Sequence, residues 1–381
     1  MKNSRKKQSY SKKKILIISR HLIKKKNDYR WFFIYDSLKE FDFINISYDS
    51  YFNQNKQKNL INKISKILKN NKIDLFIDLI FPIDLNIINE KYKQNLKYIF
   101  EIRELIKKFN VKSLRFNYPL LGSWSLTPWV YLSYFKLFIK MIQNLLLKNY
   151  YKFPKSNFVC ITGEQGKFEI YKFGVKKLYF PHFDYLIYKK AKKKLSTNKN
   201  YFLYLDQNIQ HSHDRKLVNF ESNFSNFEKE INKFLMILKK KYNTEIIIAS
   251  HPKRDLNKQT ILTKNWKIIK GDTAKLVYNS DLVIAHDTMS VNYAVLMLKP
   301  LIFISTNQLE KSFYSKTISN YSKYFYKRKI NVSEINEKDL ELSKSKLFSL
   351  NKHRYGQYKN NLIISLKNKD LKFSKIIKKI I

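Results

Sequence analysis

Short apolar runs alternate with longer amphipathic segments along the first half of the chain. The runs have the length of buried strands, and the segments between them repeat apolar residues every three to four positions, which is typical of helices that cover a sheet. Strands that alternate with helices predict a parallel, doubly wound sheet. We expect strands at residues 15–18, 43–47, 73–79, 111–116 and 158–161, and helices at residues 28–38, 60–68 and 98–109.

The alternation starts again after a polar, basic stretch at residues 188–200, which we interpret as an interdomain linker. The pattern predicts an α/β protein with two Rossmann-like, doubly wound domains that face a cleft. They are an N-terminal domain at 1–187 and a C-terminal domain at 201–330, and helices at 331–381 pack back on both. In the second domain we expect strands at residues 201–205, 245–249, 266–269, 282–285 and 301–304, and helices at residues 224–242, 273–279 and 291–298.

Length and composition agree with two packed domains, since the chain has 381 residues and is 44% hydrophobic. Its formal net charge is +45, from 75 Lys and Arg against 30 Asp and Glu. Such an excess attracts polyanions. It is spread over the whole chain and accompanies no nucleic-acid recognition module, so we expect no nucleic-acid partner. The single cysteine, Cys160, cannot form an intramolecular disulfide, which suits a reducing cytoplasm.

The most apolar long segment is residues 129–147. Lys136 and Lys140 interrupt it, so it does not have the composition of a membrane-spanning helix. Two interpretations stay open: a core helix of the first domain, or an interfacial helix that docks the protein on the inner face of the cytoplasmic membrane. The apolar run at 15–18 is too short for a signal peptide. We therefore expect a cytoplasmic protein, with peripheral association at the inner face of the membrane if this segment is the interfacial helix.

Polar clusters follow three predicted strands of the second half. They are DQN at 206–208, SHPK at 250–253 and HDTMS at 286–290. In open α/β sheets, ligands bind outside the carboxyl ends of the strands. Three neighbouring parallel strands would bring these loops to one edge, so we predict a ligand site there.

The loop at 286–290 has the clearest chemistry. Thr288 and Ser290 present hydroxyls, and a helix start behind them presents free backbone N–H groups, a combination that binds phosphate without a metal. The alternative is that these polar residues only cap the helix. The other residues that we expect at a donor phosphate are Pro252, Lys253, Thr273, His286 and Asn292.

His251 precedes a proline, which biases its backbone to extended geometry and projects its imidazole from the sheet edge. There an imidazole can protonate or hydrogen-bond a departing phosphate, and Lys253 can add a positive charge. The alternative is a histidine that only caps the end of a strand.

The sequence offers little for a metal or cofactor. His211, His213 and Asp214 lie close together, but no Cys or Glu completes a recognisable ligand set. No Walker loop and no GxGxxG pattern occurs, which leaves ATPase and dinucleotide functions without support. We therefore predict no metal and no cofactor.

The segments YFLYLDQNIQHSHD, IIIASHPKRD and KIIKGDTAKLVYNSDLVIAHDTMSVNYAVLMLKPLIFIST follow one another in this order, after ITGEQGKFEIYKFGVKKLYFPHFDY. Together they resemble the C-terminal half of a family of bacterial surface-polysaccharide (capsule or O-antigen) biosynthesis proteins, taken to be GT-B glycosyltransferases. The resemblance covers about residues 157–306. It implies the GT-B fold, a nucleotide-sugar donor as substrate, and a glycan or lipid-linked acceptor.

A looser similarity is to sialyl-, Kdo- and polyol-phosphate transferases, which pair an HP dipeptide with a later serine motif at the donor phosphate. His251 and Pro252 match the first motif, and Thr288 and Ser290 the second. The acidic-glycine motif that carries the base of sialyltransferases is missing, so their base does not transfer to this chain. The Glu-rich ribose motif of UDP- and GDP-sugar transferases is also missing after Ser290, which favours a CMP-linked donor.

Residues and resemblance together lead us to expect a metal-independent glycosyltransferase. The alternative is a non-catalytic basic protein of the same fold that binds a polyanion or an anionic membrane surface. The catalytic base would be a carboxylate facing the cleft, with Asp78, Asp84, Glu101 and Glu164 as candidates. We assign catalytic roles to His251, Asp206 and Glu164, and we expect Gln207, His213 and Asp214 to face the substrate.

Overall fold

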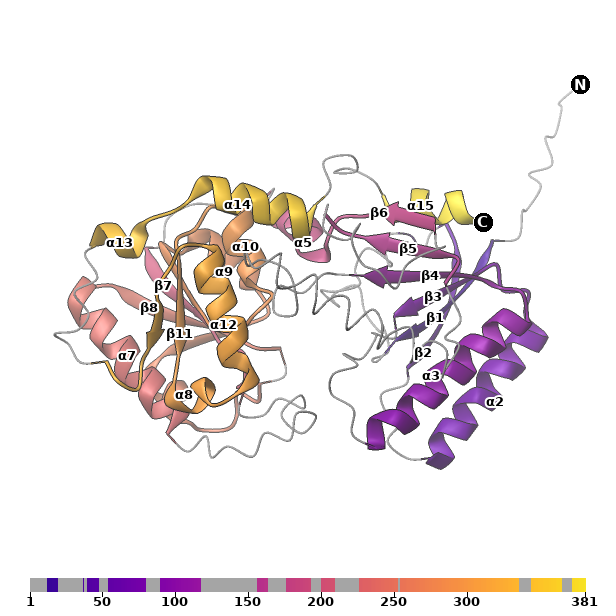
Figure 1. Ribbon diagram of the computed structural model, residues 1–381, viewed down its shortest axis with the longest axis horizontal. Coiled ribbons are helices and arrows are strands. Elements are labelled where there is room, and N and C mark those ends of the chain that lie inside the picture. Colours follow the sequence, from indigo (N-terminus) through magenta and orange to yellow (C-terminus); the bar gives the residue numbers. More distant parts are fainter. Residues whose placement is uncertain are drawn as a thin grey trace, which may run out of the picture.

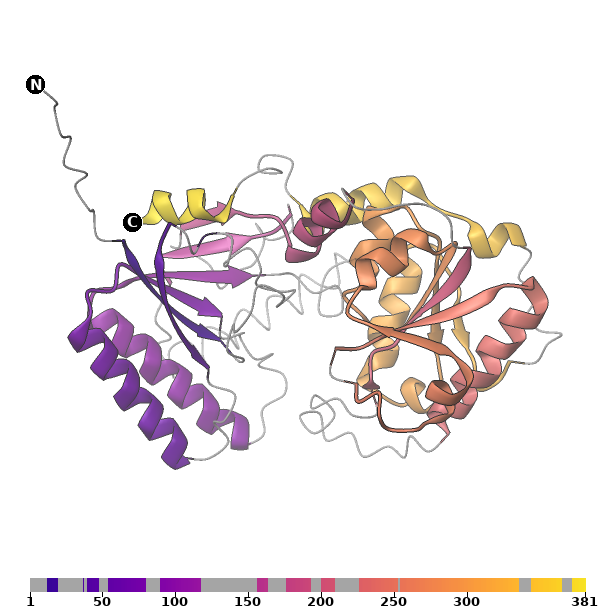
Figure 2. The same ribbon diagram turned by 180° about the vertical axis from the view of Figure 1, so that it is seen from behind.

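The computed structural model forms two α/β domains, each built around a parallel sheet, which lie side by side (Figures 1 and 2). The predicted class, with two Rossmann-like, doubly wound domains, is confirmed. The structure describes residues 12–19, 37, 40–47, 54–79, 90–117, 156–163, 176–192, 200–209, 226–252, 254–335, 344–364 and 372–381.

The N-terminal sheet has the strand order β2-β1-β3-β4-β5-β6 among the described residues. All its pairs are parallel. This order corresponds to the flavodoxin-like form of the doubly wound fold, extended by one strand. The strands are β1 (Lys14–Ser19), β2 (Asp42–Ser47), β3 (Leu75–Leu79), β4 (Lys112–Asn117), β5 (Phe158–Ile161) and β6 (Lys176–Tyr179).

Helices cover both faces of this sheet. α2 (Gln54–Asn70) and α3 (Glu90–Lys108) lie on one face, and α15 (Phe373–Ile380) lies on the other (Figure 1). Successive residues of β1 point to opposite faces, so Ile15 packs with α15, and Leu16 packs with α2 and α3. Burial on both faces explains why the inner strands β1 and β5 are almost entirely apolar.

The C-terminal sheet has the order β12-β11-β10-β7-β8-β9, again with parallel pairs only in the described part. Counted from its own first strand and read backwards, this is the 3-2-1-4-5-6 order of the Rossmann fold. The strands are β7 (Tyr201–Leu205), β8 (Glu245–Ser250), β9 (Lys267–Lys270), β10 (Leu282–Ala285), β11 (Leu301–Ser305) and β12 (Lys329–Asn331). The helices are α7 (Phe227–Tyr242), α8 (Ile261–Asn265), α9 (Thr273–Asn279), α10 (Val291–Leu296), α11 (Asn307–Glu310) and α12 (Phe313–Tyr324).

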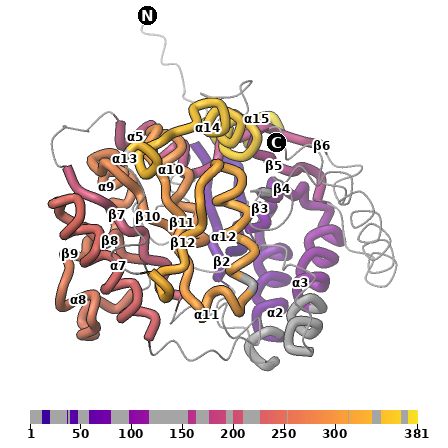
Figure 3. The backbone as a smooth tube through the Cα atoms, turned by 60° about the vertical axis from the view of Figure 1, so that its left-hand side comes forward, coloured from indigo at the N-terminus to yellow at the C-terminus, as the bar shows by residue number. Residues whose placement is uncertain are grey.

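The described part of the chain passes from the first domain to the second and later returns to the first. α5 (Phe183–Lys192) follows the last strand of the first sheet and packs on α9 and α10 of the second domain. The return passes through α13 (Lys344–Phe348), α14 (Lys352–Tyr358) and a π-helix, η4 (Lys359–Ile363). Residues of α14 and η4 join the C-terminal core, whereas α15 joins the N-terminal core (Figure 3). The C-terminal segment therefore contributes to both domains.

Two hydrogen bonds fix the place where this return crosses the end of the first sheet. The hydroxyl Oγ1 of Thr162, directly after β5, donates to the carbonyl of Leu362 (2.8 Å). The backbone N–H of His182, just before α5, donates to the carbonyl of Ile363 (2.8 Å). Both carbonyls belong to η4, so the π-helix is tied to the first domain at two points.

Gly163 tests how tightly this crossing is packed. Its φ is +54°, and an added Cβ would lie 2.2 Å from the carbonyl oxygen of Asn361 in η4. We expect Gly163→Ala to lower the free energy of unfolding by more than about 2 kcal/mol, because left-handed backbone alone costs roughly 1–2 kcal/mol in a residue with a side chain and the clash with Asn361 adds to this cost. Urea unfolding followed by circular dichroism measures this change.

Gly356 in α14 provides the matched control, because a Cβ there would meet nothing within 4 Å. Gly356→Ala should raise stability by about 0.5–1 kcal/mol, the helix preference of alanine over glycine. Equal effects of the two substitutions would contradict the close approach at Gly163.

Several described elements were not predicted, namely the edge strands β6 and β12 and the helices α5, α8, α11 and α12. Residues 188–192 of the expected linker are the end of α5. The segment at 129–147 and nearly all of the helix expected at 28–38 lie outside the described residues. Every helix in the described ranges is too short or too polar to span a bilayer.

Candidate active site

The carboxyl ends of β10, β7 and β8 form one edge of the C-terminal sheet. The three strands are consecutive neighbours and run in parallel, so the loops after them start side by side. The strand order reverses between β7 and β10, because the chain adds β8 and β9 on one side and then β11 and β12 on the other. This topological switch point is where open α/β sheets bind ligands.

A hydrogen bond joins the loops on the two sides of the switch point. The backbone N–H of Asp287, after β10, donates to Oε1 of Gln207, after β7 (3.1 Å). In the same β10 loop, Met289 packs against the hydrophobic core of the N-terminal domain. The predicted loops therefore lie together, next to the first domain.

Arg254 anchors the third loop, which follows β8. Its guanidinium is buried and donates to Oδ2 of Asp206 (2.9 Å), to Oε1 of Glu228 (2.6 Å) and to Oγ1 of Thr260 (3.0 Å). Two carboxylates offset its charge, as a buried ion needs. Lys270 donates to the Arg254 carbonyl (2.8 Å) and holds the same loop from β9.

The buried cluster of Arg254, Asp206 and Glu228 forms a clamp, and Asp206 contributes both of its carboxylate oxygens to hydrogen bonds there. Oδ2 accepts from Arg254, and Oδ1 accepts from the backbone N–H of Asn208 (2.9 Å), which has a left-handed backbone. The side chain is buried. The structure thus gives Asp206 a positioning contact with Arg254, where the sequence predicted a catalytic group.

His251 lies in the turn that Arg254 holds. Its carbonyl accepts from the backbone N–H of Arg254 (2.9 Å) and from Oγ of Ser250 (3.2 Å). The residue is partly buried, and Pro252 next to it is exposed. Lys253, expected beside them, lies outside the described residues. His251 is the first residue after β8, so it lies at the sheet edge from which the other two loops also start.

Thr288 and Ser290 present partly buried hydroxyls in the loop after β10. The Thr288 hydroxyl accepts from the backbone N–H of Ser290 (3.2 Å). Ser290 precedes α10, but its side chain makes no capping hydrogen bond. α10 has only six residues, so few peptide dipoles align behind the loop. Phosphate binding here would depend on the two hydroxyls more than on the helix start that the sequence suggested.

Asp287 is a functional candidate that the sequence interpretation treated only as a cap. It is partly buried, and burial raises the pKa of its carboxyl group to about 7. No described residue donates a hydrogen bond to its carboxylate oxygens. Groups whose pKa lies near the working pH suit proton transfer. The sequence signal was its place in a polar loop after a buried strand.

His286 points into the core. Its side chain is fully buried, Nδ1–H donates to the carbonyl of Ile304 (2.8 Å), and Nε2 accepts from the hydroxyl of Tyr204 (2.9 Å). Burial lowers its pKa to about 4, so the imidazole is neutral near pH 7. The structure therefore gives His286 a supporting place below the loop, and its contact with donor phosphate stays a prediction.

The side chain of Asn292 also forms hydrogen bonds inside the protein. Nδ2 donates to Oδ2 of Asp184 in α5 (2.7 Å), and Oδ1 accepts from the hydroxyl of Tyr358 in α14 (2.8 Å). All three side chains are buried. Asn292 therefore forms a hydrogen-bond bridge among α5, α10 and α14, and donor binding by its side chain stays a prediction.

The remaining predicted residues lie elsewhere. Thr273 begins α9 after β9, the edge strand, two strands away from the switch point. Glu164, His213, Asp214 and the alternative base Asp84 lie outside the described residues.

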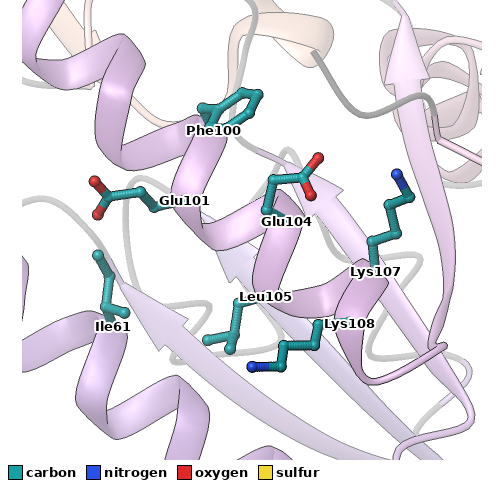
Figure 4. A pocket seen from close by; sticks show the side chains of 7 residues that line it. All are labelled: Ile61, Phe100, Glu101, Glu104, Leu105, Lys107 and Lys108. Carbon is teal, nitrogen blue, oxygen red and sulfur yellow. The ribbon is translucent and has the colours of Figure 1, made fainter. Parts of the chain in front are cut away.

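Two of the base candidates are described, and neither lies at the rim of the C-terminal sheet. Asp78 is buried in β3, where it accepts from Arg103 (2.9 Å) and Arg115 (3.0 Å). Glu101 lines an open groove of about 590 Å³ between α2 and α3, together with Ile61 and Phe100 (Figure 4). Within the described residues, no group of three or more His, Cys, Asp or Glu has an arrangement that could hold a metal ion.

Known proteins resemble this chain in structure rather than in sequence. No protein-family model and no curated protein matches it. UDP-GlcNAc 2-epimerase from Methanocaldococcus jannaschii, in complex with UDP-GlcNAc and UDP, shares 14% identity over 90% of this chain and 97% of its own, with a TM-score of 0.46. MurG from Acinetobacter baumannii shares 9% identity over 96% and 99% (TM-score 0.48). Anabaena HepE, in complex with UDP-glucose, shares 10% over 96% and 99% (TM-score 0.46).

Proposed function

We propose that this protein is a glycosyltransferase that moves a sugar from a nucleotide-activated donor to a growing surface glycan. The observation that supports it best is the junction of the loops after β7, β8 and β10. An imidazole, two hydroxyls and a carboxylate follow these strands next to the topological switch point. A scaffold that only bound a polyanion would not need this set of groups at one sheet edge.

Each group has a role in this proposal. Thr288 and Ser290 hydrogen-bond the donor phosphate, and His251 meets the negative charge that develops on the phosphate as the sugar departs. Asp206 and Arg254 hold the His251 loop in place. Hydroxyls and an imidazole can perform this task without a divalent cation, so we propose a metal-independent reaction.

The acceptor, a glycan or a lipid-linked glycan, would enter from the N-terminal domain. The arrowheads of β4, β5 and β6 point toward the C-terminal domain, so the carboxyl edge of the first sheet faces the same region (Figure 1). Peripheral association with the inner face of the membrane belongs to the same proposal. α2 supports it, because its sequence has no acidic residue and its outer face exposes Lys58, Lys63, Lys66 and Lys69.

A panel of CMP-, UDP-, GDP- and dTDP-sugars tests the function directly. We expect the protein to consume one donor class, with a CMP-sugar favoured, and to keep its rate in EDTA. Nucleotide release is the measurement. Consumption of UDP-sugars alone would overturn the CMP assignment, and a rate lost in EDTA and restored by manganese or magnesium would overturn the metal-independent mechanism.

The competing function, a non-catalytic basic protein, makes the opposite prediction. Such a protein would consume none of the four donor classes, and none of them would raise its thermal unfolding temperature, whereas a polyanion such as heparin would.

A further inference from the structure

Among the described carboxylates at the switch point, Asp287 is one whose side chain makes no hydrogen bond within the fold. Asp206, in the neighbouring loop, is bound to Arg254. Asp287 has only its backbone fixed, through the N–H bond to Gln207, and no described residue donates to its carboxylate. It directly precedes Thr288 and lies three residues before Ser290, the two hydroxyls proposed for the donor phosphate.

The described groups that face Asp287 leave its charge unbalanced. Tyr321 approaches from α12, and burial, with the nearby carboxylates of Asp287 and Asp184, raises the pKa of this phenol, so it stays neutral. His286, the preceding residue, is neutral as well. Asp206 is neutralised by Arg254. No described cation therefore compensates an ionised Asp287.

We propose that Asp287 binds the donor in its protonated form, donating a hydrogen bond to the donor phosphate and passing the proton to the departing phosphate oxygen. This inference rests on the proposed glycosyl transfer. Two negative groups in one short loop cannot both be ionised at low cost, so a bound phosphate favours the neutral acid. An ionised Asp287 repels the same phosphate.

The step balances in atoms and electrons. The bond between the anomeric carbon and the phosphate oxygen breaks, and its electron pair stays on that oxygen, which takes the proton from Asp287. The acceptor hydroxyl oxygen forms the new bond to the anomeric carbon and releases its proton to solvent. Asp287 is then ionised beside an anionic product, which promotes release, and solvent returns its proton.

Donor affinity measured against pH tests this inference. Nucleotide-sugar phosphates are esterified and do not titrate between pH 6 and 8.5, so they are better probes than free nucleotides, whose terminal phosphate titrates near pH 6. With the carboxyl pKa at about 7, affinity for the selected nucleotide-sugar should fall about 30-fold from pH 6 to 8.5. Calorimetry in two buffers should record uptake of about half a proton at pH 7.

Asp287→Asn separates this carboxyl from every other titrating group, because an amide donates a hydrogen bond but does not ionise. We expect this variant to bind the donor with pH-independent affinity and without proton uptake, and to turn over slowly. Asp272→Asn, an exposed aspartate before α9, is the matched control and should keep the wild-type profile.

Two outcomes overturn the proposal: a wild-type affinity that is flat with pH, or a pH slope that persists in Asp287→Asn. Either leaves donor binding, and with it the proposed function, intact. Absence of binding by every nucleotide-sugar at every pH contradicts the proposed function itself, and the role of Asp287 with it.

Discussion

Arg254→Ala is expected to lower the free energy of unfolding by about 3–5 kcal/mol, the range found when one partner of a buried ion pair is removed. The substitution leaves Asp206 and Glu228 buried without their shared cation. Unfolding in urea, followed by circular dichroism, measures the loss. Adding Asp206→Asn to Arg254→Ala should restore part of it, because one of the two uncompensated charges is then gone.

Arg328→Ala is the control for this experiment. Arg328 is exposed just before β12, so its removal should change stability by less than about 0.5 kcal/mol. A small effect at both positions would show that the clamp of Arg254, Asp206 and Glu228 contributes little to the fold.

His251→Ala is expected to lower kcat about 100-fold or more while donor affinity changes little. The charge on the leaving phosphate grows only as the glycosidic bond breaks, so a group that meets it acts mainly on the transition state. Ser290→Ala should instead raise the donor KM with a smaller effect on kcat, because its hydroxyl would contact phosphate before and during the reaction. Donor titrations of both folded variants measure the difference.

His353→Ala controls for the loss of an imidazole, because His353 is exposed on α14. It should leave both kinetic constants unchanged. If His251→Ala also keeps wild-type turnover, His251 only ends a strand, and the leaving phosphate must be met by another group, such as Asp287.

The strands could be predicted from the sequence wherever they are buried on both faces of the sheet. β1, β7 and β10 are uninterrupted apolar runs, and their pattern alone located them. β6 and β12 were missed, and each is a strand of only four or three residues at one edge of its sheet. An edge strand has one solvated side and tolerates charge, so KKLY and KIN carry lysines where a central strand would not.

Only part of the candidate site could be predicted from the sequence, for a different reason. The position of a polar residue after a buried strand showed which loops meet at the edge, but not which side chains point out of it. His286 and Asn292 point inward because their partners come from distant parts of the chain, such as Asp184 and Tyr358 for Asn292. Likewise, the fit between Arg254 and Asp206 depends on side-chain geometry that spacing does not encode.

The placement of α15 in the N-terminal core has a consequence for how the protein is made. Domains usually fold as units while synthesis proceeds, the N-terminal domain first. Here Phe373, Ile376, Ile377 and Ile380 cover a face of the sheet built from residues 14–179. The part of that face that α15 covers stays open on the nascent chain until the second domain has been translated. The domain made first is thus completed last, and a ribosome that stops early releases a chain with an apolar sheet face open to chaperones and proteases.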